Sequence, residues 1–226
     1  FIITSLGGPK EVIKKLRPLG IKILCDVIDS KYARKCEDLG ADALIAVNSG
    51  AGGHAGKIPL SVLLPMLKQE CKIPIISAGG IGTGEGLLST LALGADGISM
   101  GSPFIATKES PVGKEYKNAC AKYGAQDIAL TTKLSGTPCT IIQTPYVKKI
   151  GLNQNPIESF LNRNKNFKKY AKMITSLRGM NTMKNAAFGA TYKTVWCAGP
   201  SIEFVNNVES INDIVSQLKN EYKEAF

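Results

Sequence analysis

Residues Ile73–Met100 read IPIISAGGIGTGEGLLSTLALGADGISM and contain a complete strand–loop–helix–strand unit. Its two apolar runs, Ile73–Ser77 and Ile98–Met100, have the continuous hydrophobicity of strands covered on both faces. Between them, Gly84–Leu93 has the composition of a helix and is followed by Gly94, a usual helix terminator. A strand, a helix and a second strand in this order predict a right-handed unit of parallel sheet.

The same alternation extends upstream and gives five strand–helix units. An α/β fold is therefore predicted, either a (β/α)8 barrel or a doubly wound sheet. Downstream the pattern changes, with β-rich composition over residues 131–146, helical spacing within 153–184 and a final helix over 210–222. The other strands are predicted at residues 2–4, 21–27 and 43–47, and the other helices at 9–19, 30–39, 60–70 and 113–123.

Composition is typical of a folded soluble domain. The 226 residues are 44% hydrophobic and 20% charged, which excludes a disordered tail, a collagen or a coiled coil. The longest apolar runs are far shorter than the roughly 20 residues that cross a bilayer, so no membrane association is predicted. The six cysteines form no Cys-x-x-Cys pair and the single His leaves no zinc set, so we expect reduced thiols, no metal and a cytoplasmic protein.

Positive charge is concentrated in one part of the chain. The net charge is +10, and residues 146–184 hold nine basic side chains against one acidic. This segment predicts a solvated helix face or a docking site for an anionic partner. Since no DNA- or RNA-binding motif accompanies it, nucleic-acid binding is not expected, although a non-enzymatic protein that binds an anionic polymer stays the alternative class.

Two Gly-rich loops follow predicted strands at their carboxyl ends, where α/β folds bind ligands. Asn48–Gly56 carries six Gly and Ala residues around the only histidine, His54, so its backbone can approach a planar ligand beside one titratable side chain. Ser77–Gly84 opens the next helix, and backbone N–H groups in such a turn can bind phosphate. The Met100–Ser102 turn adds further N–H groups and a hydroxyl.

Together these loops predict a phosphorylated planar ligand beside one histidine, which is the shape of a flavin mononucleotide (FMN) site. Neither loop satisfies the P-loop or G-x-G-x-x-G pattern. An aldolase or a phosphosugar isomerase could use the same arrangement.

Three motifs resemble the nitronate monooxygenase family, also called 2-nitropropane dioxygenase. They are Gly52-Gly53-His54-x-Gly56, Pro74–Ile81 and Leu91–Phe104, and Trp196–Gly199 resembles the family's return to the active site. The resemblance implies a flavoprotein oxidoreductase that oxidises nitronates or nitroalkanes with O2 to a carbonyl compound and nitrite. It implies His54 as the catalytic residue and FMN as the cofactor, bound by Asn48, Gly52, Gly53, Ala78, Gly79, Gly80, Ser99, Met100, Gly101 and Ser102.

The resemblance covers only part of the family's barrel. The chain resembles strands 4–8 of a (β/α)8 TIM barrel plus a helical C-terminal subdomain, and we expect it to be a piece of a longer protein. Residues 1–130 are predicted as the partial, FMN-binding barrel, 131–196 as an inserted, mainly helical basic subdomain and 197–226 as the return segment and last helix. Val47–Gly50, Ser102 and Cys197 depart from the residues common in the family, which leaves the substrate open.

Two further expectations concern partners. An FMN- and NAD(P)H-dependent enoyl-acyl-carrier-protein reductase shares the Gly-Gly-His motif and is the rival enzyme, because the basic segment could attract an acidic carrier protein. The expected partners are otherwise a small nitronate or nitroalkane and O2, with a homodimer as the candidate assembly.

Overall fold

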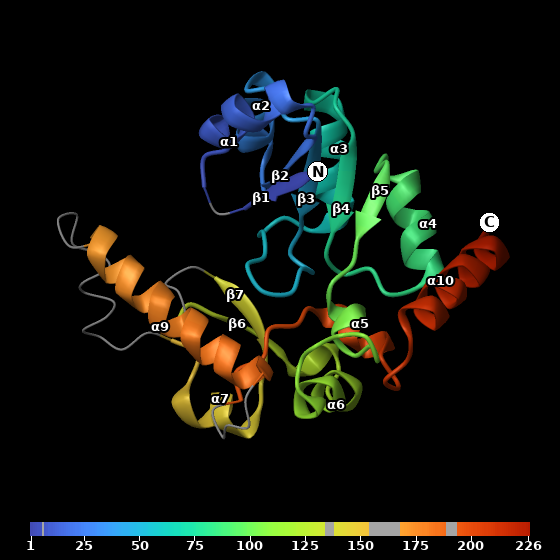
Figure 1. The fold of residues 1–226 in the computed structure, drawn as a ribbon. Helices are drawn as coiled ribbons and strands as arrows, with labels where there is room; N and C mark the ends of the chain where they lie inside the picture. The colour runs from blue at the N-terminus through green and yellow to red at the C-terminus, as the bar shows by residue number, and fades with distance from the viewer. Residues whose placement is uncertain (6, 134–137, 154–167, 189–193) are drawn as a thin grey trace. The chain divides into compact units, whose positions relative to one another are not determined.

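The computed structural model describes residues 1–5, 7–133, 138–153, 168–188 and 194–226, and of residues 168–176 and 178 the backbone only. The chain forms two compact units, each considered by itself (Figure 1). The helical spacing predicted at Ile157, Phe160 and Leu161 lies outside the described residues, as does much of the basic segment. Unit 1 comprises residues 1–51, 55–100 and 215–226, and unit 2 comprises 52–54 and 101–214.

Unit 1 is the predicted parallel sheet. Its five strands are hydrogen-bonded neighbours in the order of the sequence, β1-β2-β3-β4-β5, which confirms the α/β class and the parallel arrangement. The strands are β1 (Ile2–Thr4), β2 (Ile23–Val27), β3 (Ala43–Val47), β4 (Ile75–Ala78) and β5 (Gly97–Ser99); the helices are α1 (Lys10–Leu16), the 3-10 turn η1 (Arg17–Leu19), α2 (Ser30–Asp38), α3 (Leu60–Glu70) and α4 (Gly84–Ala92).

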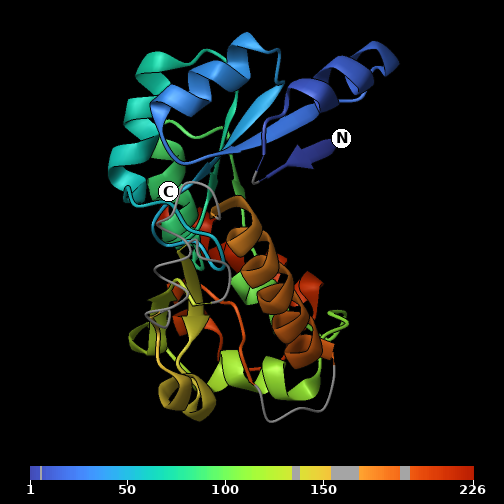
Figure 2. The ribbon, with the colours of Figure 1, turned by 90° about the vertical axis from the view of Figure 1, so that its left-hand side faces the viewer.

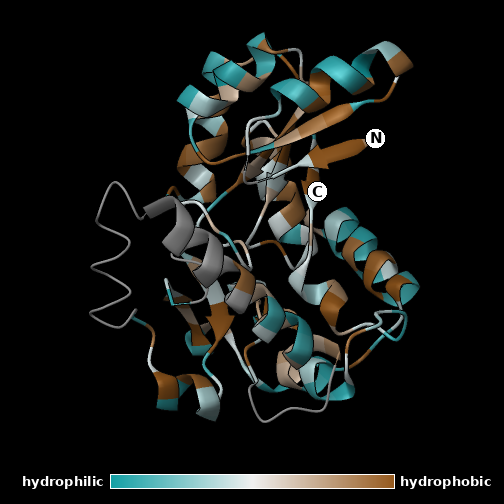
Figure 3. Cartoon of the chain, turned by 60° about the vertical axis from the view of Figure 1, so that its left-hand side comes forward, coloured by the Kyte–Doolittle hydropathy of each residue, from teal (hydrophilic) through white to brown (hydrophobic). Residues whose placement is uncertain are grey.

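Helices α1, α2 and α3 cover one face of this sheet. Ile13, Cys36 and Leu64 from these helices pack in one buried cluster with strand residues such as Leu44 and Ile75. Figure 3 shows the contrast between the apolar strands and the hydrophilic outer faces of α1 and α2. Because the strands alternate, their other side chains form a second, smaller cluster on the opposite face.

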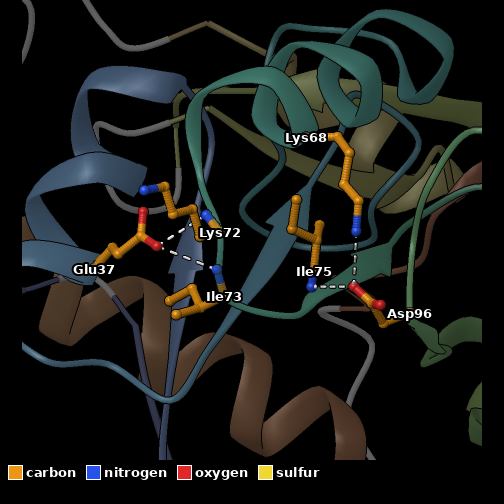
Figure 4. A network of polar contacts seen from close by, with 6 residues as sticks. All are labelled: Glu37, Lys68, Lys72, Ile73, Ile75 and Asp96. Atoms are coloured by element: carbon orange, nitrogen blue, oxygen red, sulfur yellow. Dashed lines mark hydrogen bonds and ion pairs between the residues drawn. The ribbon is translucent and has the colours of Figure 1, made fainter.

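A repeated tetrapeptide fixes the strand starts. Leu-Gly-Ala-Asp occurs at residues 39–42 and 93–96, and both glycines have positive φ, 93° and 97°, at the end of a helix. Asp42 Oδ2 accepts the backbone N–H of Ile23 at 2.9 Å, and Asp96 Oδ2 accepts that of Ile75 at 2.9 Å. Figure 4 shows Asp96 at the start of β4, where Glu37 also accepts the two N–H groups of residues 72 and 73. These carboxylates hold the amino ends of the strands, opposite the edge expected to bind ligands.

Unit 2 contains an antiparallel pair of strands, of which β7 lies within the predicted β-rich stretch 131–146 and β6 ends where that stretch begins. Two buried clusters stabilise it, one around Tyr116 and Trp196, whose rings stack at 5.4 Å, and one around Cys139 and Val195. The 21-residue α9 runs beside this second cluster, which it joins through Met183 (Figure 2). The elements are α5 (Ser102–Ile105), α6 (Lys114–Lys122), η2 (Ala125–Asp127), β6 (Ile128–Thr131), β7 (Cys139–Ile142), α7 (Pro145–Ile150), α9 (Lys168–Phe188) and η3 (Pro200–Phe204); α10 (Ile211–Ala225) begins in unit 2 and ends in unit 1.

No helix in the described ranges combines the length and the apolar character that a membrane span requires. The domain boundaries expected at residues 130 and 196 stay a prediction.

Candidate functional site

In unit 1, the predicted cofactor-binding residues gather at the carboxyl edge of the sheet. The register places Val47 beside Ala78 and Ala78 beside Ser99, so the loops that follow β3, β4 and β5 start side by side. Asn48 is the first residue of one of these loops, and Gly79 and Met100 hold the same place in the other two. This is the edge at which open parallel sheets and barrels bind ligands.

Asn48 joins the first two loops. Its Nδ2 donates to the carbonyl of Gly79 at 2.8 Å, and its Oδ1 accepts the N–H of Gly50 at 2.7 Å. Its backbone N–H donates to the carbonyl of Ala78 at 3.0 Å, and its side chain is almost fully buried. The structure therefore gives Asn48 a positioning role within unit 1, and direct contact with a cofactor stays a prediction.

The glycines of these loops permit backbone to pack on backbone. A Cβ at Gly50 would lie 2.9 Å from the Cα of Gly80, and one at Gly79 would lie 2.6 Å from the Cα of Ala51. Gly79 also has a φ of 109°, which side chains other than glycine rarely adopt. Side chains here would push the two loops apart, so the Gly-rich sequence sets the spacing of the loops.

The start of α4 is already occupied, which corrects part of the phosphate prediction. Glu221 from α10 accepts the N–H of Gly84 at 2.8 Å, and Thr83 Oγ1 accepts that of Gly86 at 3.1 Å. These are two of the orphan amides that a helix N-terminus would offer to an anion. Within the described residues the N–H of Gly80 donates to no acceptor. Phosphate binding is therefore predicted at the turn that contains Gly80, and not at the first amides of α4.

In unit 2, a strand holds the segment that carries the histidine. Gly53 pairs with Thr140 of β7 as an isolated antiparallel bridge, with Thr140 N–H donating to Gly53 O at 2.7 Å and Gly53 N–H donating to Thr140 O at 3.3 Å. The Thr140 hydroxyl adds a third bond to Gly53 O at 3.1 Å. His54 follows this bridge directly, so its backbone position is set by β7.

The other side of the same segment packs against the return of the chain. A Cβ at Gly52 would lie 2.7 Å from the N atom of Gly199 and 3.0 Å from Ser102 Oγ. Ser102 Oγ accepts the Gly199 N–H at 2.8 Å, and the Ser102 side chain is buried. The predicted phosphate ligand Ser102 therefore holds the return segment, and its hydroxyl proton stays able to donate.

His54 is half-buried, and this desolvation lowers the pKa of its imidazole below the ordinary value of about 6.5. Burial penalises the charged form, so the imidazole is neutral at neutral pH. A neutral imidazole can accept a proton from a substrate, which is the property that a general base needs.

Gly101 lies in unit 2 at the start of α5. Neither its backbone conformation nor its packing against the described residues requires a glycine. Its φ is −121°, open to any residue, and a Cβ there would meet no atom within 4 Å. Neither Gly101 nor Ser102 donates its backbone N–H to an acceptor within the described part of the chain. A ligand that approaches this turn closely would account for the glycine. Among the remaining predicted contacts, Ser99 and Gly101 are exposed and Ala78 and Met100 are half-buried.

Thr140 and Glu221 lie 87 and 137 residues from their partners, and neither belongs to a motif that marks it as part of a site. Gly199 was noted only as part of the return segment. Local pattern carries no signal for such pairings, although the Thr-Ile-Ile run after Cys139 was part of the predicted β-rich stretch.

A parallel α/β sheet with glycine loops at its carboxyl edge is typical of the α/β proteins that bind small ligands where the strands end. The sequence matches the family described as "Nitronate monooxygenase" over residues 1–221. The chain belongs to this family, which confirms the resemblance of the three motifs.

Individual relatives show the range of the family. The chain is 34% identical over 146 residues, 65% of its length, to "(3aS,4S,5R,7aS)-5-hydroxy-7a-methyl-1-oxo-octahydro-1H-indene-4-carboxyl-CoA dehydrogenase" of Rhodococcus jostii and covers 41% of that protein. It superposes on FabK from Thermotoga maritima with a TM-score of 0.82 at 27% identity, over 98% of this chain and 67% of that one. It superposes on nitroalkane oxidase from Streptomyces ansochromogenes with a TM-score of 0.71 at 26% identity, over 99% and 62%. The chain thus spans less than half the length of the Rhodococcus relative.

Proposed function

We propose that this protein is an FMN-dependent oxidoreductase that oxidises nitronates and nitroalkanes with O2 to a carbonyl compound and nitrite. Membership of the nitronate monooxygenase family and the likeness to a nitroalkane oxidase support this proposal. The observation that carries it is the neutral, half-buried imidazole of His54 on a glycine segment bonded to β7.

The residues of each unit fit the cofactor. In unit 1, Asn48, the Ala78–Gly80 turn, Ser99 and Met100 would contact FMN. In unit 2, Gly52, Gly53, Gly101 and Ser102 would do so. The support is the set of open amides at Gly80, Gly101 and Ser102, together with the glycine at 101 that the protein itself does not require. When bound, FMN would take an electron pair from the substrate and deliver it to O2.

The chain's own residues would bind, orient and deprotonate the substrate. With a neutral nitroalkane, the unprotonated ring nitrogen of His54 would accept the α-proton, so the carbanion forms as the nitronate. With a preformed nitronate no proton is removed, and the imidazole would orient the nitro group by hydrogen bonding. The bonds from Thr140 to Gly53 limit the movement of the backbone that carries the ring. General-base catalysis of this kind contributes about 10²- to 10⁴-fold in rate.

The test compares His54→Ala with the wild-type protein on both substrate forms. We expect the variant to keep its yellow colour and to lose about 10²- to 10⁴-fold of kcat/KM on neutral nitroethane. The loss on ethylnitronate should be smaller, because that substrate needs no base. Full turnover of the variant on both forms would contradict the role assigned to His54.

A second candidate is an FMN- and NAD(P)H-dependent enoyl-acyl-carrier-protein reductase. It is favoured by the likeness to the Rhodococcus relative, which is named as a dehydrogenase of a carboxyl-CoA thioester. The basic residues over 146–184 would attract an acidic carrier protein. NAD(P)H oxidation with a crotonyl thioester, set against O2 uptake with propionate-3-nitronate, separates the two activities.

A further inference from the structure

Three sulfur atoms from distant parts of the sequence lie in contact within unit 2. Cys139 Sγ in β7 is 3.6 Å from Cys197 Sγ, and Cys197 Sγ is 3.2 Å from Met183 Sδ in α9. The extended segment around Cys197 runs alongside β7, since the N–H of Ile142 donates to the carbonyl of Trp196 at 2.9 Å. Both cysteines are free thiols. Both cysteines belong to one hydrophobic cluster with Val147, Val195 and Met183.

We propose that Cys139 and Cys197 form a modification site at which a hydroperoxide oxidises the two thiols to a reversible disulfide. In the first step, the Cys139 thiolate attacks the peroxide, the O–O bond breaks, and a sulfenic acid and an alcohol (water, for H2O2) result. In the second step, the Cys197 sulfur attacks the sulfenic sulfur and water leaves. Two electrons pass from the sulfurs to the peroxide, and the sulfurs approach from 3.6 Å to about 2.05 Å.

The two thiols differ in a way that assigns these steps. The hydrogen bond from Cys197 lowers the pKa of Cys139, while the same contact and burial raise the pKa of Cys197. The lowered pKa favours Cys139 as the attacking sulfur, and the raised pKa of Cys197 favours it as the resolving thiol. Cys197 is partly exposed and Cys139 is buried, so we expect a small peroxide to reach the pair through Cys197.

Each cysteine of the pair lies close to a residue that contacts the Gly52–His54 segment. Thr140, next to Cys139, forms the bridge to Gly53, and Gly199, two residues after Cys197, packs on Gly52. A disulfide brings the two sulfurs about 1.5 Å closer, so we expect Thr140 and Gly199 to move toward each other. The Gly52–His54 segment contacts both residues and should move with them. Oxidation is therefore expected to reduce turnover. That consequence rests on the proposed function, whereas formation of the disulfide does not.

A second cysteine pair in the same chain provides a matched control. Cys25 and Cys36 in unit 1 also contact each other, but both are completely buried, and burial raises the pKa of Cys36 to about 12. A pair in which neither thiol is accessible should not react. Contact alone therefore predicts oxidation of both pairs, and the proposal predicts oxidation of one.

The experiment treats the purified protein with H2O2 and maps its tryptic peptides without reduction. We expect peptides 134–148 and 194–219 to be joined, with a mass about 2 Da below the sum of the two, and to separate on adding dithiothreitol. In Cys197→Ser the sulfenic acid at Cys139 should persist and react with dimedone. In Cys139→Ser no dimedone adduct should form at Cys197.

Equal oxidation of the Cys25–Cys36 pair, sulfinic acid at Cys139 without a cross-link, or no reaction at either cysteine would overturn the proposal. Peptide mapping needs no flavin and no substrate. A cross-link in a protein without nitronate turnover would thus reject the proposed function alone, and turnover without a cross-link would reject this inference alone.

Discussion

Replacing Gly101 by alanine tests whether a ligand, rather than the protein, requires a glycine at this turn. The φ of −121° suits alanine, and the new Cβ would meet no atom of the described residues within 4 Å. The folded state is therefore not strained, while the unfolded chain loses conformational freedom. We expect the free energy of unfolding to stay constant or to rise by about 0.4–1 kcal/mol.

The same methyl group has a different effect if the phosphate of FMN lies against the amides of residues 101 and 102. Crowding a packed site by one methyl typically costs about 1–3 kcal/mol. Because about 1.4 kcal/mol corresponds to a tenfold change in Kd, FMN should bind roughly 5- to 150-fold more weakly. Riboflavin, which has no phosphate, should bind Gly101→Ala as well as it binds the wild type.

Quenching of flavin fluorescence during titration with apoprotein measures both dissociation constants. Gly97→Ala is the matched control, because a Cβ there also meets no atom within 4 Å but lies at the start of β5, away from its carboxyl end. Its affinity for FMN should not change. Unchanged binding of FMN by Gly101→Ala, or an equal loss for FMN and riboflavin, would refute the placement of the phosphate.

Three further predictions concern pH, stability and packing. Since burial lowers the pKa of His54, protonation should abolish the base only below about pH 6.5, so kcat/KM for nitroethane should be flat above that pH and fall below it. Asp96→Ala leaves the Ile75 N–H without its acceptor and should lower the free energy of unfolding, measured in urea, by about 1–3 kcal/mol. Lys68→Ala removes only an exposed ion pair with Asp96 and should lower it by under about 1 kcal/mol. Tyr116→Phe removes the hydrogen bond from the Tyr116 hydroxyl to the Cys197 carbonyl and should lower the free energy of unfolding by about 1 kcal/mol. Unfolding can be followed by the fluorescence of the single tryptophan.

Much of unit 1 could be predicted because its signals are local. Helix α3 spans the predicted residues 60–70, and α2 begins at the predicted residue 30, with Asp29 capping it by accepting the N–H of Tyr32. Strand β5 is shifted by one residue from the predicted 98–100, and β4 begins two residues late, after Pro74. The ends of a strand depend on its neighbour, because a strand ends where the adjacent strand no longer forms hydrogen bonds with it.

The site was less predictable, because its supports come from distant segments. Glycine loops and a lone histidine are visible in the sequence, but the bridge from Gly53 to Thr140 and the capping of α4 by Glu221 are not. The repeated Leu-Gly-Ala-Asp can be read from the sequence, but its structural role cannot. That role is for each aspartate to accept a backbone N–H from the preceding strand. The contact of Cys139 with Cys197 joins residues 58 apart, so composition could indicate only reduced thiols.

The central claim is that the amides at these strand ends bind a flavin nucleotide. It is tested most directly by the visible absorption spectrum of the purified protein, followed by release and chromatography of the bound pigment. We expect the visible absorption bands of a bound flavin, and FMN as the released compound. A colourless protein that also fails to quench the fluorescence of added FMN would contradict it.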